Sequence, residues 1–391
     1  MRSRSIIALV LFIALFAAGC RRSSTPPPAA PPAAPTSGEQ PLTPAVGGAT
    51  PPPQTKHFKG SIGSTLDLQM KLVQNGDQLS GSYFYQKVGT RITLRGTVDK
   101  EGNLSLDEFD PNGKQTGVFK GLWTIDKEDG LITLAGNWSK PPGEKGDDKK
   151  TAFSVHEEPI NFSSEVDVVA KSVKEKNEKL NYEIDAEYPQ FTGGNNPNLE
   201  KFNQAARALV MGQVTGFKKE MAPAEGEEAP PEGSMGSDLG IGYTIALAQD
   251  DLISVQFDIG SYYQGAAHPN SSTTTLNYDL KNGKALKLPD LFKPGSKYLQ
   301  AISTYCVADL KKQSKEKGLE LLDSVFADGA APKSQNYEGG WTITKKGLGI
   351  YFDAYQVGPY AAGPQFVMVP YSALKDLIKP EGPIGLFAMY N

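Results

Sequence analysis

Residues 254–288, with the sequence SVQFDIGSYYQGAAHPNSSTTTLNYDLKNGKALKL, decide how the second half of this chain folds. Apolar and polar side chains alternate along residues 254–259 and again along residues 274–280, which is the period of a half-buried strand. Asn282-Gly283 follows the second run and predicts a type I′ hairpin turn. The stretch therefore predicts two strands that are joined by a tight connection and followed by a turn.

The connection between these strands, residues 262–270, has a composition that an ordinary turn does not need. It combines two aromatic residues, a run of small residues and a histidine, and loops of this kind often carry function. The candidate ligand-binding residues here are Tyr262, Tyr263, Gly265, His268, Pro269 and Asn270. The alternative is structural: His268 satisfies buried carbonyl groups, and the glycine only permits a tight turn.

A second motif of the same character, YQVGPYAAGP, lies at residues 355–364. Its candidate ligand-binding residues are Tyr355, Tyr360 and Gly363. Tyrosine supplies a broad amphipathic contact area, which suits the face of a sugar ring or a protein partner. We therefore expect the two motifs to be halves of one surface, with their loops adjacent in the fold.

Together with the segment LPDLF at residues 288–292, the two motifs resemble the extracellular domain of RsiV-like proteins. In that family the domain is the sensing part of lysozyme-responsive anti-sigma factors, and it also accompanies polysaccharide deacetylase domains. The resemblance covers roughly residues 160–385, and this chain has Gly265-Ala266-Ala267 where family members more often carry two glycines. It implies a domain of unknown function whose partner is peptidoglycan or a wall-active protein such as lysozyme.

The N-terminus has the features of a bacterial export signal, residues 1–19. A basic start precedes an apolar run at residues 6–18, which is shorter than the roughly 20 residues of a transmembrane helix. Ala17-Ala18-Gly19-Cys20 resembles the lipobox of bacterial lipoproteins, although leucine is more usual at the first position. The resemblance implies lipidation of Cys20 and a membrane anchor. Arg21 resembles an outer-membrane sorting signal, so we expect an exported protein in the outer membrane, facing the periplasm.

Composition divides the remainder of the chain into three parts. Residues 20–55 are rich in proline and alanine and predict an extended tether. Residues 56–158 contain apolar runs about 8–12 residues apart with turn residues between them, which predicts an all-β domain, either a small meander barrel or a sandwich. Residues 159–391 predict an α+β domain with a mainly antiparallel sheet. Its expected helices include residues 319–325 and 371–378, and residues 221–236 predict an exposed acidic loop.

Charge, cysteine and histidine content argue against several classes of function. The net charge of −4 provides no basic field to attract nucleic acid. Cys306 falls on the apolar face of a predicted helix, so we expect a buried thiol and not a reactive one. The three histidines, His57, His156 and His268, are isolated in the sequence, so we expect no metal site and no cofactor.

Catalytic arrangements can be drawn, but they lack the flanking motifs of known enzymes. Ser261, His268 and Asp353 could form a hydrolase triad without its G-x-S-x-G turn, and Asp258 and Asp353 could pair as glycosidase carboxylates. We therefore expect a lipid-anchored cell-envelope protein, not an enzyme, that binds peptidoglycan or a lysozyme-like protein. The alternatives are a cell-wall polysaccharide hydrolase or deacetylase that uses His268 and Asp353, and a structural envelope spacer.

Overall fold

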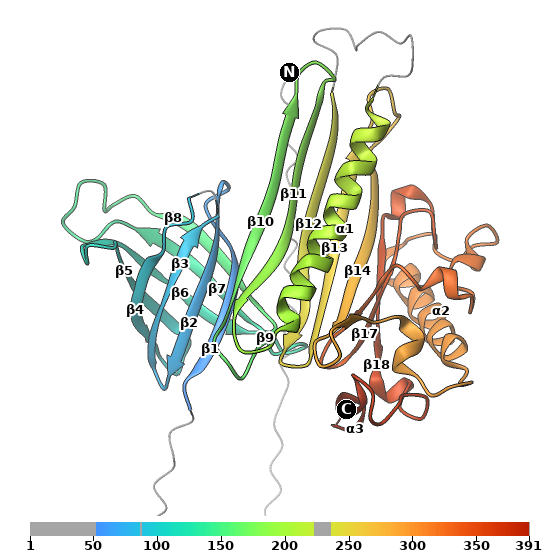
Figure 1. The fold of residues 1–391 in the computed structure, drawn as a ribbon. Coiled ribbons are helices and arrows are strands. Elements are labelled where there is room, and N and C mark those ends of the chain that lie inside the picture. Colours follow the sequence, from blue (N-terminus) through green and yellow to red (C-terminus); the bar gives the residue numbers. More distant parts are fainter. Residues whose placement is uncertain (1–51, 87, 223–235, 391) are drawn as a thin grey trace, which may run out of the picture. The chain divides into compact units, whose positions relative to one another are not determined.

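The computed structural model describes residues 52–86, 88–222 and 236–390, which belong to one compact unit of the chain (Figure 1). The expected export signal, Cys20 and nearly all of the expected tether lie outside these residues. Most of the acidic segment at residues 221–236 also lies outside them.

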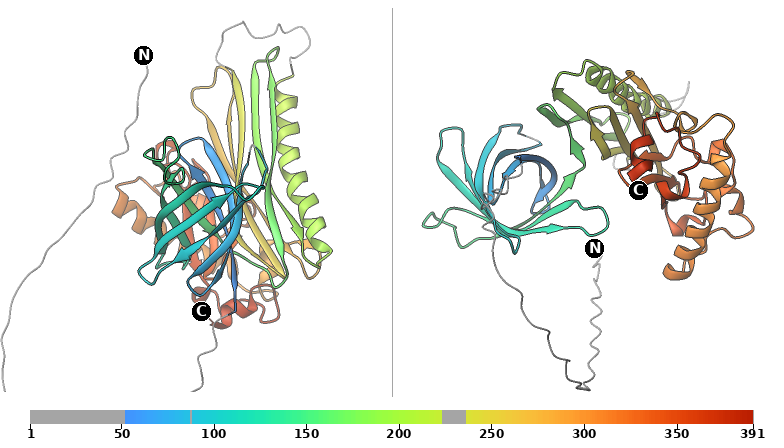
Figure 2. Two further views of the ribbon diagram at one scale, coloured as in Figure 1. Left: turned by 90° about the vertical axis from the view of Figure 1, so that its left-hand side faces the viewer. Right: turned by 90° about the horizontal axis from the view of Figure 1, so that it is seen from below.

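An eight-stranded closed barrel forms the first part of the described chain (Figure 2). Each strand pairs antiparallel with its sequence neighbours, and the first strand closes the barrel against the eighth. The all-β expectation is therefore confirmed, and the architecture is a barrel and not a sandwich. The strands are β1 (Gln54–Ile62), β2 (Leu66–Asn75), β3 (Gln78–Tyr85), β4 (Ile92–Val98), β5 (Asn103–Phe109), β6 (Gln115–Ile125), β7 (Ile132–Ser139) and β8 (Thr151–Glu158).

Glycines inside the strands allow the barrel to close with so few strands. A Cβ atom at Gly81 would lie 2.0 Å from the carbonyl oxygen of Lys71 on β2. One at Gly96 would lie 1.9 Å from the carbonyl oxygen of Ser105 on β5. Any larger residue would push these neighbouring strands apart, so the recurring glycines mark places where the backbones approach closely.

The chain continues into a seven-stranded sheet whose pairs are mainly antiparallel. The exception is its central long strand, β12, which pairs parallel with both β11 and β9. The strands are β9 (Ile160–Asn161), β10 (Val166–Asn177), β11 (Tyr182–Gly193), β12 (Ser237–Gln249), β13 (Leu252–Tyr262), β14 (Asn270–Asp279) and β15 (Lys284–Ala285).

One long helix, α1 (Asn198–Glu220), packs against one face of this sheet (Figure 1). Its buried residues recur three or four positions apart from Leu199 to Phe217, so a single apolar stripe faces the strands. Asn196 Oδ1 accepts the Asn198 N–H at 2.9 Å, which satisfies one free donor of the first turn. The helix thus starts directly after Asn196-Pro197, and it packs mainly against β11.

A second core lies between α2 (Tyr298–Lys317) and a three-stranded antiparallel sheet. Cys306 is fully buried there, and burial raises the pKa of its thiol to about 12, as expected of an unreactive filler. The remaining elements are β16 (Trp341–Ile343), β17 (Gly347–Phe352), β18 (Gln365–Pro370) and α3 (Gly385–Tyr390). Within the described ranges, no helix is both long and apolar enough to cross a membrane.

Two expected helices do not form. Residues 319–325 are irregular and precede a short 3₁₀ turn at Ala327–Ala330, and residues 371–378 contain only the 3₁₀ turn Tyr371–Ala373. Leu322 has a φ of +56°, which is outside the helical region. Segments this short depend on packing for helix formation, so their apolar spacing alone was insufficient evidence.

The expected type I′ turn at Asn282-Gly283 is also wrong in detail. Such a turn needs a positive φ at both residues, but only Gly283 has one, at +65°. The Asp279 side chain accepts the Asn282 N–H at 2.8 Å, and the Gly283 N–H reaches the Asp279 carbonyl at 2.8 Å. The aspartate therefore builds a longer turn over residues 280–283.

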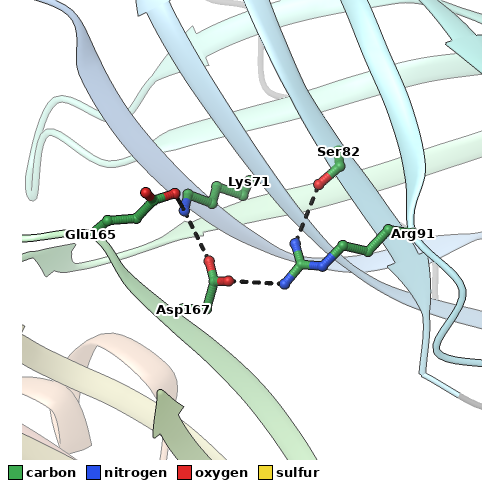
Figure 3. Close-up of polar contacts among 5 residues, drawn as sticks. All are labelled: Lys71, Ser82, Arg91, Glu165 and Asp167. Atoms are coloured by element: carbon green, nitrogen blue, oxygen red, sulfur yellow. Dashed lines mark hydrogen bonds and ion pairs between the residues drawn. The ribbon is translucent and has the colours of Figure 1, made fainter. Parts of the chain in front are cut away.

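Asp167 on β10 accepts hydrogen bonds from two barrel side chains (Figure 3). Lys71 Nζ and an Arg91 guanidinium nitrogen each lie 2.9 Å from one of its oxygens. Lys71 also donates to Glu165 at 3.0 Å, and Arg91 donates to Ser82 at 3.4 Å. Burial alone would raise the pKa of the Asp167 carboxyl. The hydrogen bond from Lys71 and the positive charges of Lys71 and Arg91 outweigh burial and hold this pKa below its ordinary value.

Candidate functional site

The two loops singled out in the sequence lie side by side. Residues 263–269 connect β13 to β14, and residues 353–364 connect β17 to β18. His268 of the first loop stacks on Tyr360 of the second, with 4.0 Å between ring centroids and 27° between ring planes. The Tyr355 ring lies 6.3 Å from His268 and 5.5 Å from Tyr360. We call these three residues, His268, Tyr355 and Tyr360, the aromatic cluster.

The backbone carbonyl of Pro269 orients the His268 ring. Its oxygen lies 2.9 Å from His268 Nδ1 and accepts a hydrogen bond from Tyr360 Oη at 2.8 Å. Because a carbonyl oxygen only accepts hydrogen bonds, Nδ1 carries the proton of the neutral ring and Nε2 keeps its lone pair. Nε2 lies 3.5 Å from the Tyr355 hydroxyl, which is long for a hydrogen bond. The exposed His268 thus presents a proton acceptor to an incoming ligand.

Unusual backbone conformations shape both loops. Tyr355 has a φ of +68°, a left-handed conformation that is rare for a bulky residue and is found preferentially at functional sites. Gly265 and Gly363 also have positive φ values, of +85° and +67°. Glycine is favoured at both positions by the turns that present the aromatic rings, since it adopts such angles without steric cost.

Asp353 lies at the start of the second loop, two residues before Tyr355. The Thr273 N–H of β14 donates to Asp353 Oδ1 at 2.8 Å, and the Asp353 N–H donates to Gln356 Oε1 at 3.2 Å. Burial raises the pKa of Asp353, although the hydrogen bond from Thr273 acts in the opposite direction. Sequence reasoning named Asp353 but missed Thr273 and Gln356. No local pattern signals a contact between residues 80 positions apart.

The other candidates from the first motif do not join the aromatic cluster. Tyr263 packs on Phe217 of α1, with 5.5 Å between centroids, and its hydroxyl donates to Glu220. Tyr262 ends β13 opposite Asp238, and Asn270 begins β14 opposite Ser261. The first motif is therefore divided: Tyr263 packs against α1, while Pro269 and His268 face the second motif.

The catalytic arrangements drawn from the sequence are not assembled by direct contacts. In the part of the chain that the structure describes, no hydrogen bond joins Ser261, His268 and Asp353. Asp258 accepts a hydrogen bond from Gln256 at 2.6 Å, whereas Asp353 is held by Thr273. The described residues also contain no group of three or more His, Cys, Asp or Glu side chains that could hold a metal ion.

Two family models match separate segments of this chain, and the aromatic cluster takes its residues from both. Residues 174–271 match the model "Deacetylase PdaC", and residues 289–372 match "Protein of unknown function (DUF3298)". His268 belongs to the first segment, while Tyr355 and Tyr360 belong to the second. The expected likeness to a domain of unknown function is therefore confirmed, whereas the likeness to RsiV-like proteins stays a prediction.

A curated relative carries the same name as the first model. The chain is 28% identical over 202 residues to the peptidoglycan-N-acetylmuramic acid deacetylase PdaC of Bacillus subtilis (strain 168). The aligned region covers 52% of this chain and 40% of that enzyme, so the chain spans less than half of its relative. These findings contradict our expectation that the chain is not an enzyme. The lone motifs on which we based that expectation could not reveal the relationship, because it extends over a whole segment.

Two solved structures of the DUF3298 family resemble this fold at low identity. The protein from Bacteroides fragilis has 18% identity, a TM-score of 0.39, and coverage of 59% of this chain and 98% of its own. The protein from Pseudomonas aeruginosa PAO1 has 16% identity, a TM-score of 0.38, and coverage of 56% and 95%. Likenesses at this level say nothing about the site.

Proposed function

We propose that this protein removes acetyl groups from a cell-wall polysaccharide, with the aromatic cluster and Asp353 as its active site. The proposal is carried by the position of His268 relative to the segment that matches the deacetylase model. The segment similar to Deacetylase PdaC ends at residue 271, directly after the loop that carries His268, and this ring stacks on Tyr360. The similarity to a peptidoglycan deacetylase supports peptidoglycan as the substrate.

Deacetylation needs a proton acceptor, a donor for the carbonyl oxygen, and a surface for the sugar. A water oxygen attacks the acetyl carbonyl carbon, the carbon–nitrogen bond breaks, and acetate and a free amine leave. His268 Nε2 would take the proton of the water and deliver it to the departing nitrogen. The Tyr355 hydroxyl would donate to the carbonyl oxygen as negative charge develops there. The Tyr360 ring would contact the sugar face.

Asp353 would serve as a second group for proton transfer in this mechanism. Its pKa is raised by burial, and carboxyl groups tuned in this way are frequent in active sites. The Thr273 N–H holds the carboxyl, and the Gln356 side chain holds the Asp353 backbone at the base of the loop that carries Tyr355. Gln356 is itself anchored, since its amide donates to the carbonyls of Gly329 and Asn336 at 3.1 and 3.0 Å.

We also propose that the protein acts outside the cytoplasm, where peptidoglycan lies. The features that support this are the lipobox-like residues ending at Cys20 and the proline-rich tether at residues 20–55. A lipid on Cys20 would anchor the chain to the outer membrane on the periplasmic side. The tether would then give the folded part reach toward the wall.

The decisive experiment measures acetate release from purified peptidoglycan by the purified protein and its variants. His268→Gln removes the proton acceptor and should lower the rate about a hundredfold or more. Tyr355→Phe removes only the hydroxyl and should lower kcat more than it changes KM. The matched control is Tyr263→Phe, which alters a tyrosine of the same loop that packs on α1, and it should leave the rate unchanged.

Two outcomes would overturn the proposal. The first is an absence of acetate release by the parent protein. The second is equal release by the parent and His268→Gln, with both proteins shown to be folded by circular dichroism. A loss of activity in Tyr263→Phe equal to that in His268→Gln would place the site nearer α1 than we propose.

A further inference from the structure

A groove of about 320 Å³ runs along the sheet face opposite α1, between that face and the strands β17 and β18. One wall comes from the outward residues of β13 and β14, and the other comes from β17, β18 and the end of the loop before β18. The groove adjoins the candidate site through Thr273, which lines the groove and whose N–H donates to Asp353 at 2.8 Å. The groove is therefore the surface next to Asp353 on the side of β14.

Glycines form an open floor beside this groove. Gly240 of β12 pairs with Gly260 of β13, and Gly242 pairs with Asp258, so all three glycines face outward. Apart from chain neighbours, no atom of the described residues comes within 4 Å of a Cβ added to Gly240 or Gly242. For Gly260 the nearest such atom is the Gly240 oxygen, at 4.0 Å.

Neither packing nor backbone geometry requires glycine at these positions. None of the three has a positive φ, and glycine weakens the interior of a strand. Their effect is instead to keep the sheet surface flat and free of side chains. Such glycines typically mark a place where a ligand or another backbone approaches closely.

The opposite wall carries an aromatic pair, of which Phe366 is exposed and Tyr351 is partly buried. The rings of Tyr351 and Phe366 lie 4.9 Å apart at 48°, and Phe366 is 41% exposed. A Cβ at Gly349 would lie 2.9 Å from the Phe366 ring, so the ring lies directly over β17. Aromatic faces held in this way next to a flat floor suit the apolar face of a sugar ring.

Polar groups complete the lining of the groove. Asp258 is exposed and held by Gln256 Nε2 at 2.6 Å, and the outward side chains of Ser271 and Thr273 lie opposite Gly260 and Asp258. A carboxylate, an amide and hydroxyls provide acceptors and donors for sugar hydroxyl groups. The combination of a flat floor, an aromatic wall and several hydrogen-bonding groups favours a linear saccharide over a purely apolar ligand.

We propose that this groove binds the sugar units that adjoin the one held at the aromatic cluster, so that the protein recognises an extended polysaccharide chain. The proposal rests on the proposed deacetylation site but concerns chain recognition and not the chemical step. Phe366 and the glycine floor are its specificity-determining features. The structure thus predicts that affinity grows with the length of the saccharide.

The test measures binding of a disaccharide and a hexasaccharide of N-acetylglucosamine to the purified protein by isothermal titration calorimetry. The parent should bind the hexasaccharide more tightly. Gly260→Thr inserts a side chain into the floor at a strand position that suits threonine, and Phe366→Ala removes the aromatic wall. Each should weaken hexasaccharide binding about tenfold, close to the loss of one aromatic contact, and leave disaccharide binding nearly unchanged.

Matched controls make the same substitutions away from the groove. Gly212→Thr changes an open glycine on α1, and Leu386→Ala changes an exposed side chain of α3 that does not line the groove. Both should bind the hexasaccharide as the parent does. Thermal unfolding should show all four variants folded, and Phe366→Ala keeps the test decisive if Gly260→Thr does not fold.

The outcomes separate this inference from the proposed function. Equal affinity of the parent for the two saccharides, or parent-like hexasaccharide binding in folded Gly260→Thr and Phe366→Ala, would overturn the groove proposal whatever the acetate assay shows. Length-dependent binding that is lost in these variants, without acetate release by the parent, would support the groove and overturn only the deacetylation proposal. His268→Gln should keep its length dependence.

Discussion

Glu158→Gln should stabilise the protein at alkaline pH and leave it little changed at acidic pH. Glu158 ends β8, pairs with His57 of β1, and is only 9% exposed. No donor among the described residues reaches its Oε2 atom. Burial raises the pKa of this carboxyl from its ordinary value of 4.5 to about 7, although the positive charge of Lys59 acts in the opposite direction.

The size of the effect follows from the two pKa values. In the unfolded chain the carboxyl loses its proton near pH 4.5, whereas in the folded protein it keeps the proton up to about pH 7. The folded state therefore holds the extra proton between these values, and stability falls as the pH rises through this window. At about 1.4 kcal/mol for each pH unit, the free energy of unfolding loses about 3 kcal/mol.

His57 hides this effect in the parent protein because it acts in the opposite direction. Burial, together with the charge of Lys71, lowers the pKa of the imidazole from 6.5 to about 4. The unfolded chain then binds the extra proton, so stability falls as the pH decreases through that window, again by about 3 kcal/mol. Over most of the shared range the two contributions nearly cancel.

The assay is urea denaturation at about pH 4 and about pH 8, followed by tryptophan fluorescence. Two of the three tryptophans, Trp123 and Trp138, lie in the barrel and report its unfolding. Relative to the parent, Glu158→Gln should gain about 3 kcal/mol more at the alkaline pH than at the acidic pH. His57→Gln should show the opposite dependence. An identical stability difference at both pH values for Glu158→Gln would refute the reasoning.

Two further predictions concern the tether and the sheet that carries the site. Cys20→Ser should abolish membrane association, measured by fractionation of cells, because the thiol that would carry the lipid is gone; unchanged partitioning would contradict lipidation. Asn203→Leu should lower the free energy of unfolding by about 3 kcal/mol, measured by denaturation, since the buried amide bonds both the N–H and the carbonyl of Phe191, at 2.9 and 2.8 Å. The exposed neighbour Gln204→Leu is its control, and an equal effect of the two would contradict this account.

The strands of this protein could be predicted from local pattern, because apolar and polar residues alternate along a strand that is buried on one face. Residues 254–259 and 274–279 alternate as expected and form parts of β13 and β14. The recurring glycines of the barrel likewise mark real close approaches of its strands. The predictions of helices at residues 319–325 and 371–378 were wrong, because helices that short depend on tertiary packing.

The site was only partly accessible to the same reasoning. Loop composition singled out His268, Tyr355 and Tyr360, and the three rings do lie together. It also singled out Tyr263, whose ring instead packs against α1. Composition identifies an unusual loop, but it does not predict which neighbour each side chain of that loop contacts in the fold.

The sequence by itself determined the strand periods, the turns that need glycine, and the two loops that carry the candidate residues. Only the tertiary structure decided that His268 meets Tyr355 across 87 positions, and that Thr273 holds Asp353. It also decided that Gly240 and Gly260 lie side by side in the sheet face that continues into the groove. The physical reason is that alternation tells which residues share one face of a strand, whereas the partner of that face depends on how distant elements pack.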